Sequence, residues 1–105
     1  MYNAPIFLYF QADWCRYCDL LERELLDTKQ GKQALSKAVK VLITPENGAQ
    51  EKRLFKQMRG KGYPTTLIKQ PHGSAPIKYT LIRKVNNSWT TKSAGYLEQI
   101  INPIY

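Results

Sequence analysis

A buried-strand pattern that leads directly into two cysteines constrains this chain more than any other feature. Residues 4–11, "APIFLYFQ", form a short run of aromatic and branched apolar side chains, typical of a strand covered on both faces in a parallel sheet. The residues that follow repeat apolar side chains at helical spacing on one face: Trp14, Cys18, Leu21 and Leu25. The sequence therefore predicts a helix that begins at Cys15, immediately after a buried strand.

The rest of the chain alternates strand and helix patterns over a length of 105 residues, which favours one domain, residues 1–105. Further helices are predicted at 28–38 and 49–59, with a last helix after a capping Ser93. Further strands are predicted at 38–44, within 60–70, and as an edge strand at 77–85, with a turn at 71–74 and a loop at 86–93. The first helix is expected to break near Asp27 and Thr28. The strand–helix–strand units predict parallel pairing, and the tight link at 71–76 predicts a final antiparallel hairpin. The order β-α-β-α-β-β-α thus predicts an α/β fold with a central mixed sheet flanked by helices.

The charge of the chain is strongly basic and unevenly placed. The net charge is +8, and residues 52–105 carry ten bases against the single acid Glu98. Such asymmetry fits nucleic acid, an anionic membrane, an acidic partner or simply a solvated basic face. The bases follow no nucleic-acid motif, and no apolar run is long enough to span a membrane. We therefore expect no nucleic-acid partner and no membrane span.

The two cysteines, Cys15 and Cys18, allow three interpretations. A Cys-x-x-Cys pair is half of a structural zinc site, but His72 is the one histidine that could complete it. Two buried thiols without chemistry are the second interpretation. The third is a redox pair, which the position after a strand favours because a helix start stabilises a thiolate and lowers its pKa below about 8.5. On this interpretation Cys15 is the exposed nucleophile and Cys18, one turn along, is the shielded resolving thiol. No metal is expected.

Three stretches together resemble the thioredoxin superfamily: the strand "IFLYF", the motif "ADWCRYC" and the distant "GYPT". The resemblance implies a thioredoxin-like fold and a thiol–disulfide oxidoreductase that works through Cys15 and Cys18 without a cofactor. It also implies a cis peptide bond before Pro64, close to the two sulfurs. The residues expected to contact a substrate are Trp14, Arg16, Tyr17, Tyr63, Pro64 and Thr65.

The chain departs from typical thioredoxins in several places. It begins at the active-site strand, which resembles the short thioredoxin-like domains of exported bacterial proteins. Arg16 and Tyr17 replace the usual Gly-Pro between the cysteines. Tyr9 stands where many thioredoxins place a buried aspartate behind the second cysteine, and Lys40 is spaced like the lysine beside that aspartate. Gly60 interrupts the apolar approach to "GYPT".

These features favour a reductase of protein or peptide disulfides that receives electrons from an unidentified donor protein. A disulfide oxidase or isomerase is the alternative direction. A thioredoxin-fold binding module that docks an acidic partner is the alternative from another class. It would use the basic face of residues 52–92, where five bases cluster just before Pro64: Lys52, Arg53, Lys56, Arg59 and Lys61. We expect a monomer in the periplasm or otherwise exported, with the cytoplasm as the alternative compartment.

Overall fold

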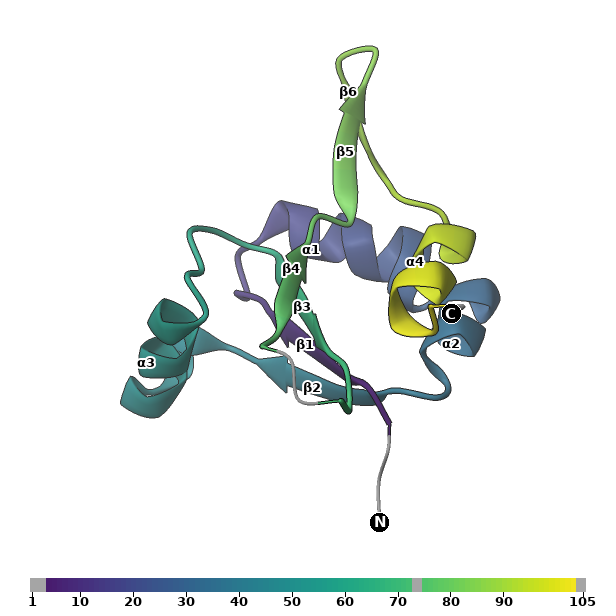
Figure 1. Ribbon diagram of the computed structural model, residues 1–105. Helices are drawn as coiled ribbons and strands as arrows, with labels where there is room; N and C mark the ends of the chain where they lie inside the picture. Colours follow the sequence, from purple (N-terminus) through teal and green to yellow (C-terminus); the bar gives the residue numbers. More distant parts are fainter. Residues whose placement is uncertain (1–3, 73–74, 104–105) are drawn as a thin grey trace.

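A four-stranded mixed sheet forms the centre of the computed structural model, which describes residues 4–72 and 75–103 (Figure 1). The strand order is β2-β1-β3-β4, with β1 and β2 parallel and the other pairings antiparallel. The strands of this sheet are β1 (Ile6–Phe10), β2 (Val39–Ile43), β3 (Thr65–Lys69) and β4 (Ile77–Tyr79). The predicted α/β class with a mixed central sheet is confirmed.

Helices cover both faces of the sheet. They are α1 (Arg16–Leu21), which continues as a π-helical segment (Glu22–Leu26), then α2 (Lys29–Leu35), α3 (Ala49–Gln57) and α4 (Ala94–Ile101); a short 3-10 turn spans Pro45–Asn47. Figure 1 shows α3 apart from the other helices, across the sheet from α1, α2 and α4. Within residues 4–72 and 75–103, no helix is both long and apolar enough to cross a membrane.

The alternation of side chains along β1 divides the hydrophobic core into two clusters. Phe7 and Tyr9 face the larger cluster under α1, α2 and α4, whereas Phe10 joins a smaller cluster under α3. The larger cluster contains Cys18, Leu21, Leu25, Leu35, Leu97 and Ile101, each at most 2% exposed. β1 is therefore covered on both faces, as its composition predicts, and its C-terminal end leads directly to the cysteines.

The predicted break near Asp27 and Thr28 is confirmed, because the π-helical segment ends at Leu26 and α2 begins at Lys29. Thr28 caps α2, because its hydroxyl oxygen accepts a hydrogen bond from the backbone N–H of Gly31 at 3.0 Å. Gly31 is buried in the first turn of α2, where an added methyl group would collide with the carbonyl oxygen of Leu25. Glycine weakens a helix pattern, yet here it permits the close approach of two turns.

The predicted parallel direction of the strand after α3 is wrong. β3 runs antiparallel to β1, with Thr65 paired to Phe10 and Lys69 paired to Ile6. The reason is that residues 58–64 return the chain to the same end of the sheet at which β2 ended, so β3 starts where β1 ends. This arrangement places the "GYPT" segment beside the cysteine loop.

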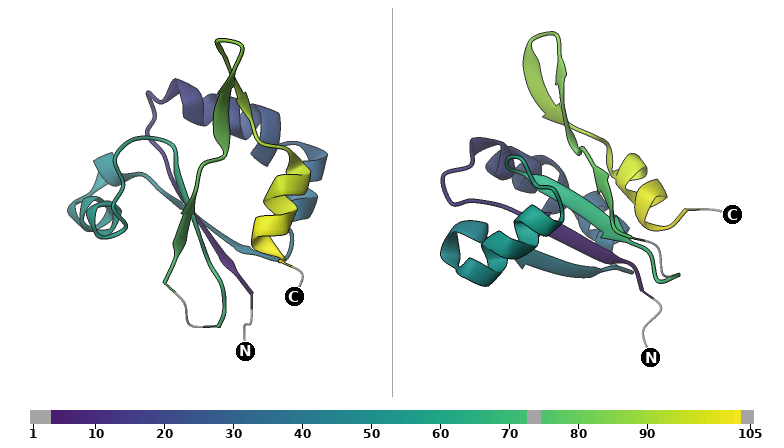
Figure 2. Two further views of the ribbon diagram at one scale, coloured as in Figure 1. Left: turned by 45° about the horizontal axis from the view of Figure 1, so that its top comes forward. Right: turned by 60° about the vertical axis from the view of Figure 1, so that its left-hand side comes forward.

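The single edge strand predicted at 77–85 and the loop predicted at 86–93 are also wrong. The chain leaves the sheet after β4, buries Leu81 in the larger cluster and forms a separate two-stranded hairpin from β5 (Ile82–Val85) and β6 (Ser88–Thr91). Asn86 and Asn87 join the strands with φ angles of 51° and 64°, a left-handed conformation that asparagine tolerates well and that suits a two-residue hairpin turn. The hairpin projects from the body of the molecule in all views (Figures 1 and 2).

The remaining elements follow the sequence closely. The predicted antiparallel pairing after residues 71–76 is confirmed by β3 and β4, although part of the predicted turn at 71–74 lies outside the described residues. Ser93 caps α4, since its hydroxyl oxygen accepts a hydrogen bond from the backbone N–H of Tyr96 at 3.1 Å. The last helix therefore begins where its polar capping residue predicts.

Candidate active site

Cys15 and Cys18 form a disulfide at the start of α1, with their Cα atoms 5.2 Å apart. Cys15 is the N-cap residue of this helix, and its sulfur accepts a hydrogen bond from the backbone N–H of Cys18 at 3.0 Å. The loop before it is held by a second bond, from the Cys15 N–H to the carbonyl of Ala12 at 3.1 Å. The predicted helix start at Cys15 is confirmed, and the two sulfurs are bonded to each other.

The predicted exposure of Cys15 is wrong for this disulfide state. Cys15 is 3% exposed and Cys18 is 1% exposed, so both sulfurs belong to the core rather than to the surface. A disulfide across one helical turn draws the N-cap side chain toward the helix axis, where neighbouring side chains cover it. What distinguishes the two cysteines is their position: Cys15 precedes the helix, whereas Cys18 lies one turn inside it on the face shared with Leu21.

Trp14 does not share the buried helical face predicted for it. Its side chain is 68% exposed, because it precedes the helix and points away from the core. The indole Nε1–H donates a hydrogen bond to Oε1 of Glu46 at 2.8 Å, and the ring meets Tyr63 edge-on at 5.7 Å. Tyr63 in turn stacks on Phe55 with ring centroids 5.1 Å apart. A row of aromatic rings therefore joins the cysteine loop to the "GYPT" segment.

The "GYPT" segment lies at the same end of the sheet as the disulfide. The peptide bond between Tyr63 and Pro64 is cis. Thr65 is buried and pairs with Phe10, the last residue of β1, while its hydroxyl donates a hydrogen bond to the carbonyl of Gly62. Burial raises the pKa of Tyr63, and the nearby charge of Glu46 raises it further. The fold thus brings together segments about 50 residues apart in the sequence.

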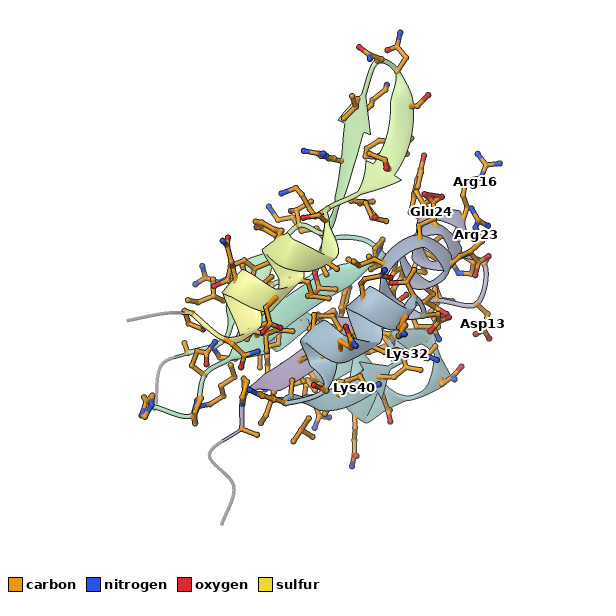
Figure 3. All side chains as sticks on the ribbon, turned by 90° about the vertical axis from the view of Figure 1, so that its right-hand side faces the viewer. Asp13, Arg16, Arg23, Glu24, Lys32 and Lys40 are labelled. Atoms are coloured by element: carbon orange, nitrogen blue, oxygen red, sulfur yellow. A yellow bond between two sulfur atoms is a disulfide. The ribbon has the colours of Figure 1, made fainter. Side chains whose placement is uncertain are left out.

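Arg16 and Tyr17, the two residues between the cysteines, take no part in this aromatic row. Arg16 is exposed and projects outward from the start of the helix (Figure 3). Tyr17 packs against Trp89 of the β5–β6 hairpin, with ring centroids 5.1 Å apart and an interplanar angle of 52°. The two predicted substrate contacts therefore face the hairpin, and Trp89 is a neighbour that the sequence pattern did not reveal.

Behind Cys18, Tyr9 contacts a carboxylate that the sequence interpretation missed. The Tyr9 hydroxyl donates a hydrogen bond to Oε2 of Glu22 at 2.7 Å and lies 3.4 Å from the carbonyl oxygen of Cys18. Burial raises the pKa of Tyr9, and its hydrogen bond to Glu22 raises it further. Glu22 follows Cys18 by four residues, a spacing that places both on one side of a helix and could have revealed it.

The Tyr9–Glu22 pair borders a cavity of about 260 Å³ between β1, β2 and the helices. Phe7, Leu35 and Leu42 give the cavity an apolar lining, and Lys40 of β2 reaches it as well. Lys40 is exposed at the outer edge of the sheet (Figure 3). The cavity is therefore lined by a tyrosine, two carboxylates (Glu22 and Asp27) and a lysine, where the family resemblance predicts an aspartate and a lysine.

A mixed sheet, a Cys-x-x-Cys disulfide at a helix start and a proline segment beside it define the thioredoxin-like class of proteins. A family model described as thioredoxin-like matches residues 2–71. The chain belongs to the thioredoxin-like family.

Solved structures support the same fold. The oxidised C-terminal domain of DsbD from Neisseria meningitidis has 22% sequence identity and a TM-score of 0.63, over 93% of this chain and 78% of that domain. A DsbH oxidoreductase has 19% identity and a TM-score of 0.61, over 93% and 70% of the two chains. Oxidised thioredoxin O2 from Arabidopsis thaliana has 13% identity and a TM-score of 0.60, over 98% and 76%.

Because these sequence identities are low, the structural matches show the fold and nothing more. The curated protein sequences contain no significant match to this chain. The family and the geometry together establish a thioredoxin-like protein with a Cys15–Cys18 disulfide, for which protein disulfides are the general class of partner.

Proposed function

We propose that the protein is a thiol–disulfide oxidoreductase that reduces disulfides in proteins or peptides. The observation that carries the proposal is the Cys15–Cys18 disulfide, in which the first sulfur caps a helix and accepts a hydrogen bond from the second residue's N–H. In the reduced protein the same N–H and the helix dipole favour the Cys15 thiolate, which is the form that attacks a disulfide.

The reaction proceeds by two exchanges. The Cys15 thiolate attacks one sulfur of the substrate disulfide, forms a mixed disulfide and releases the other substrate sulfur as a thiolate, which takes up a proton. Cys18, once deprotonated, attacks the Cys15 sulfur, closes the Cys15–Cys18 disulfide and releases the second substrate thiol. Two electrons pass from the dithiol to the substrate, and a dithiol donor protein must then reduce Cys15–Cys18 again.

The segment around Pro64 is the proposed binding strip for the substrate backbone. Thr65 pairs with Phe10 on one side, whereas the pairing with β4 on the other side begins only at Thr66. An extended substrate can therefore add backbone hydrogen bonds at this end of β3, in the manner of β-augmentation. The exposed ring of Trp14, edge-on to Tyr63, supplies an apolar wall for the same strip.

Glu22 is the group we assign to receive the proton of Cys18. Tyr9 remains protonated because its pKa is raised, so it serves as a donor to Glu22 rather than as a base. Glu22 lines the same cavity as Lys40 and Leu42 of the edge strand β2, and we propose this cavity as the route of the proton to water. A Glu22→Gln variant tests this role by slowing the release of the mixed disulfide more than the first attack.

The test of the proposed function is insulin reduction with dithiothreitol as electron source, in which a turbidity increase reports the reduced chains. We expect wild-type protein to shorten the lag and Cys15→Ser to abolish the effect. Cys18→Ser is the matched variant: reduced, freed of dithiothreitol and mixed with insulin, it retains the attacking thiolate and accumulates a mixed disulfide with substrate, visible by mass spectrometry. Undiminished insulin reduction by Cys15→Ser would rule the proposal out.

We also propose that electrons flow from the protein to its substrate, because "GYPT" resembles the corresponding segment of reductase-like exported members of the family. Equilibration of the Cys15–Cys18 pair against glutathione measures its reduction potential. A value near about −120 mV, the range of strong periplasmic oxidases, would contradict reduction and favour the oxidase alternative. The periplasm is the compartment we propose, and fractionation of the native host tests it.

The second candidate function is the binding of an acidic partner. The observation that favours it is the exposure of the basic residues on and after α3, before Pro64. The cluster comprises Lys52, Arg53, Lys56, Arg59 and Lys61. The helix α3, which carries Lys52, Arg53 and Lys56, lies across the sheet from α1, so these bases can attract a partner without covering α1 (Figure 1). A Cys15→Ser protein that still binds a partner, while insulin reduction is lost, would show that both roles coexist.

A further inference from the structure

The β5–β6 hairpin stands beside the disulfide and closes one side of an open hollow against α1. The hollow has a volume of about 450 Å³ and is lined by Arg16, Tyr17, Asp19, Leu20, Arg23 and Trp89. We infer that this hollow binds an acidic polypeptide segment of the substrate, next to the disulfide that the protein reduces. The inference rests on the proposed function, because it names the class of substrate for the same site.

The position of the hollow ties it to the chemistry. Arg16, which lines it, is bonded directly to Cys15, and Tyr17 is the other residue between the two cysteines. A polypeptide whose disulfide meets Cys15 therefore places its flanking residues either along the Pro64 strip or in this hollow. The hairpin is thus placed to contact substrate on the side of α1 that the Pro64 strip does not reach.

The Tyr17–Trp89 contact fixes the hairpin in this position. The rings lie 5.1 Å apart, and a tilted aromatic pair of this kind holds two elements together beyond the burial of area alone. Trp89 nevertheless remains 44% exposed, so part of its ring is open toward the hollow. A rigid, half-exposed aromatic side chain is a suitable anchor for a polypeptide, because it loses little entropy on binding.

The charge of the hollow selects an acidic occupant. Arg16 and Arg23 line it; Arg16 projects from α1, and Arg23 from the π-helical segment that continues α1 (Figure 3). Lys84 is the cross-strand partner of Trp89, and such partners share one face of a hairpin, so a third cation stands beside the ring. Asp19 is the one acid among the lining residues, and Glu24 lies 3.6 Å from Arg23 at the exposed rim. The three cations outnumber these two acids.

A polypeptide fits these features better than a nucleic acid does. Single-stranded nucleic acids are bound by aromatic rings that are free to stack on successive bases. Here the rings of Tyr17 and Trp89 contact each other at an interplanar angle of 52°, so they offer no pair of parallel faces for successive bases. Aspartate and glutamate side chains spaced along a peptide can instead pair with Arg16, Arg23 and Lys84 separately.

The test measures the binding of a fluorescein-labelled, cysteine-free peptide rich in Glu, by anisotropy, to the oxidised wild-type protein and its variants. The absence of cysteine separates docking from disulfide exchange. Lys84→Glu reverses a charge beside Trp89. Arg83→Glu is the matched control, because Arg83 lies on the same strand but faces the opposite side of the hairpin. Lys84→Gln serves as the milder variant if Lys84→Glu does not fold.

We expect Lys84→Glu to raise the Kd about three- to tenfold and Arg83→Glu to raise it less than about twofold. Trp89→Ala should weaken binding as well, and added salt should weaken wild-type binding. Equal losses in the Lys84 and Arg83 variants would overturn the inference, because they would indicate a general charge effect. So would a larger loss in Lys56→Glu on α3, or stronger competition by a single-stranded oligonucleotide of equal charge.

Reduction of hydroxyethyl disulfide, a small neutral substrate, distinguishes the two hypotheses. Peptide binding at the hairpin without any disulfide exchange would support the docking surface and contradict the proposed function. The opposite result is a protein that reduces hydroxyethyl disulfide but binds the acidic peptide no more tightly than a neutral peptide of equal length. That result would support the proposed function and overturn the docking surface.

Discussion

Replacement of Tyr9 by phenylalanine tests the structure behind Cys18 most directly. Tyr9 is 6% exposed and donates a 2.7 Å hydrogen bond to Glu22, and burial is the largest cause that raises its pKa. The folded phenol therefore stays protonated well above pH 10, whereas the unfolded phenol ionises near pH 10. A raised folded pKa gives stability that is fully present below pH 10 and is lost as pH rises above it.

The expected magnitude follows from this linkage. At pH 11 the unfolded chain gains RT ln(1 + 10) from ionisation of Tyr9, about 1.4 kcal/mol, while the folded protein gains little. The wild-type free energy of unfolding should therefore fall between pH 8 and pH 11 by about 1.4 kcal/mol more than that of Tyr9→Phe. At pH 8 the variant should be less stable by about 1 to 2 kcal/mol, because it loses a hydrogen bond to a carboxylate.

The assay is urea unfolding of the oxidised proteins at pH 8 and pH 11, followed by circular dichroism. Tyr96→Phe is the matched control, because it removes one phenol from the unfolded chain but leaves Tyr9 in place. This control should retain the wild-type loss of stability that is due to Tyr9. Equal losses of stability in wild type and Tyr9→Phe would refute a protonated, buried Tyr9 joined to Glu22.

Three further substitutions test the packing and capping of the fold by urea unfolding at neutral pH. Gly31→Ala should lower the free energy of unfolding by about 1 to 3 kcal/mol, because the added methyl group collides with the carbonyl of Leu25; an unchanged value would contradict that close approach. Leu97→Ala should lower it by about 2 to 5 kcal/mol, because Leu97 is 0% exposed, and a loss below about 1 kcal/mol would indicate a loosely packed core. Ser93→Ala should cost about 1 kcal/mol through the lost cap on the N–H of Tyr96, and Ser93→Gly should cost less, so the reverse order would argue against capping.

Local patterns predicted much of the fold because the interactions behind them are local. The helix start at Cys15 and the Ser93 cap depend on the backbone N–H groups of the next few residues. The covered strand β1 is evident because apolar side chains on both faces require cover on both faces. The break at Thr28 is evident because a threonine that caps the next turn competes with continuation of the helix.

Other features were mispredicted because one sequence pattern fits two structures, and contacts with residues far away in the sequence decide between them. An alternating stretch at 77–85 suits either one strand or two, and the burial of Leu81 decides for two. Trp14 shares the helical period of Cys18 and Leu21 but lies outside the helix, where Glu46 and Tyr63 hold it. The exposure of Cys15 depends on whether the disulfide is closed, which periodicity does not describe.

The sequence by itself determined the thiol pair, its place after a buried strand and the distant proline segment, because these depend on residue type and short spacing. Only the tertiary structure decided which groups surround the pair. It joined Glu22 to Tyr9 behind Cys18 and set Trp89 against Tyr17 in front of the hollow. Those contacts link elements that approach one another only when the sheet and helices pack. Burial of apolar area stabilises such contacts equally whether the residues are near or far apart in the sequence.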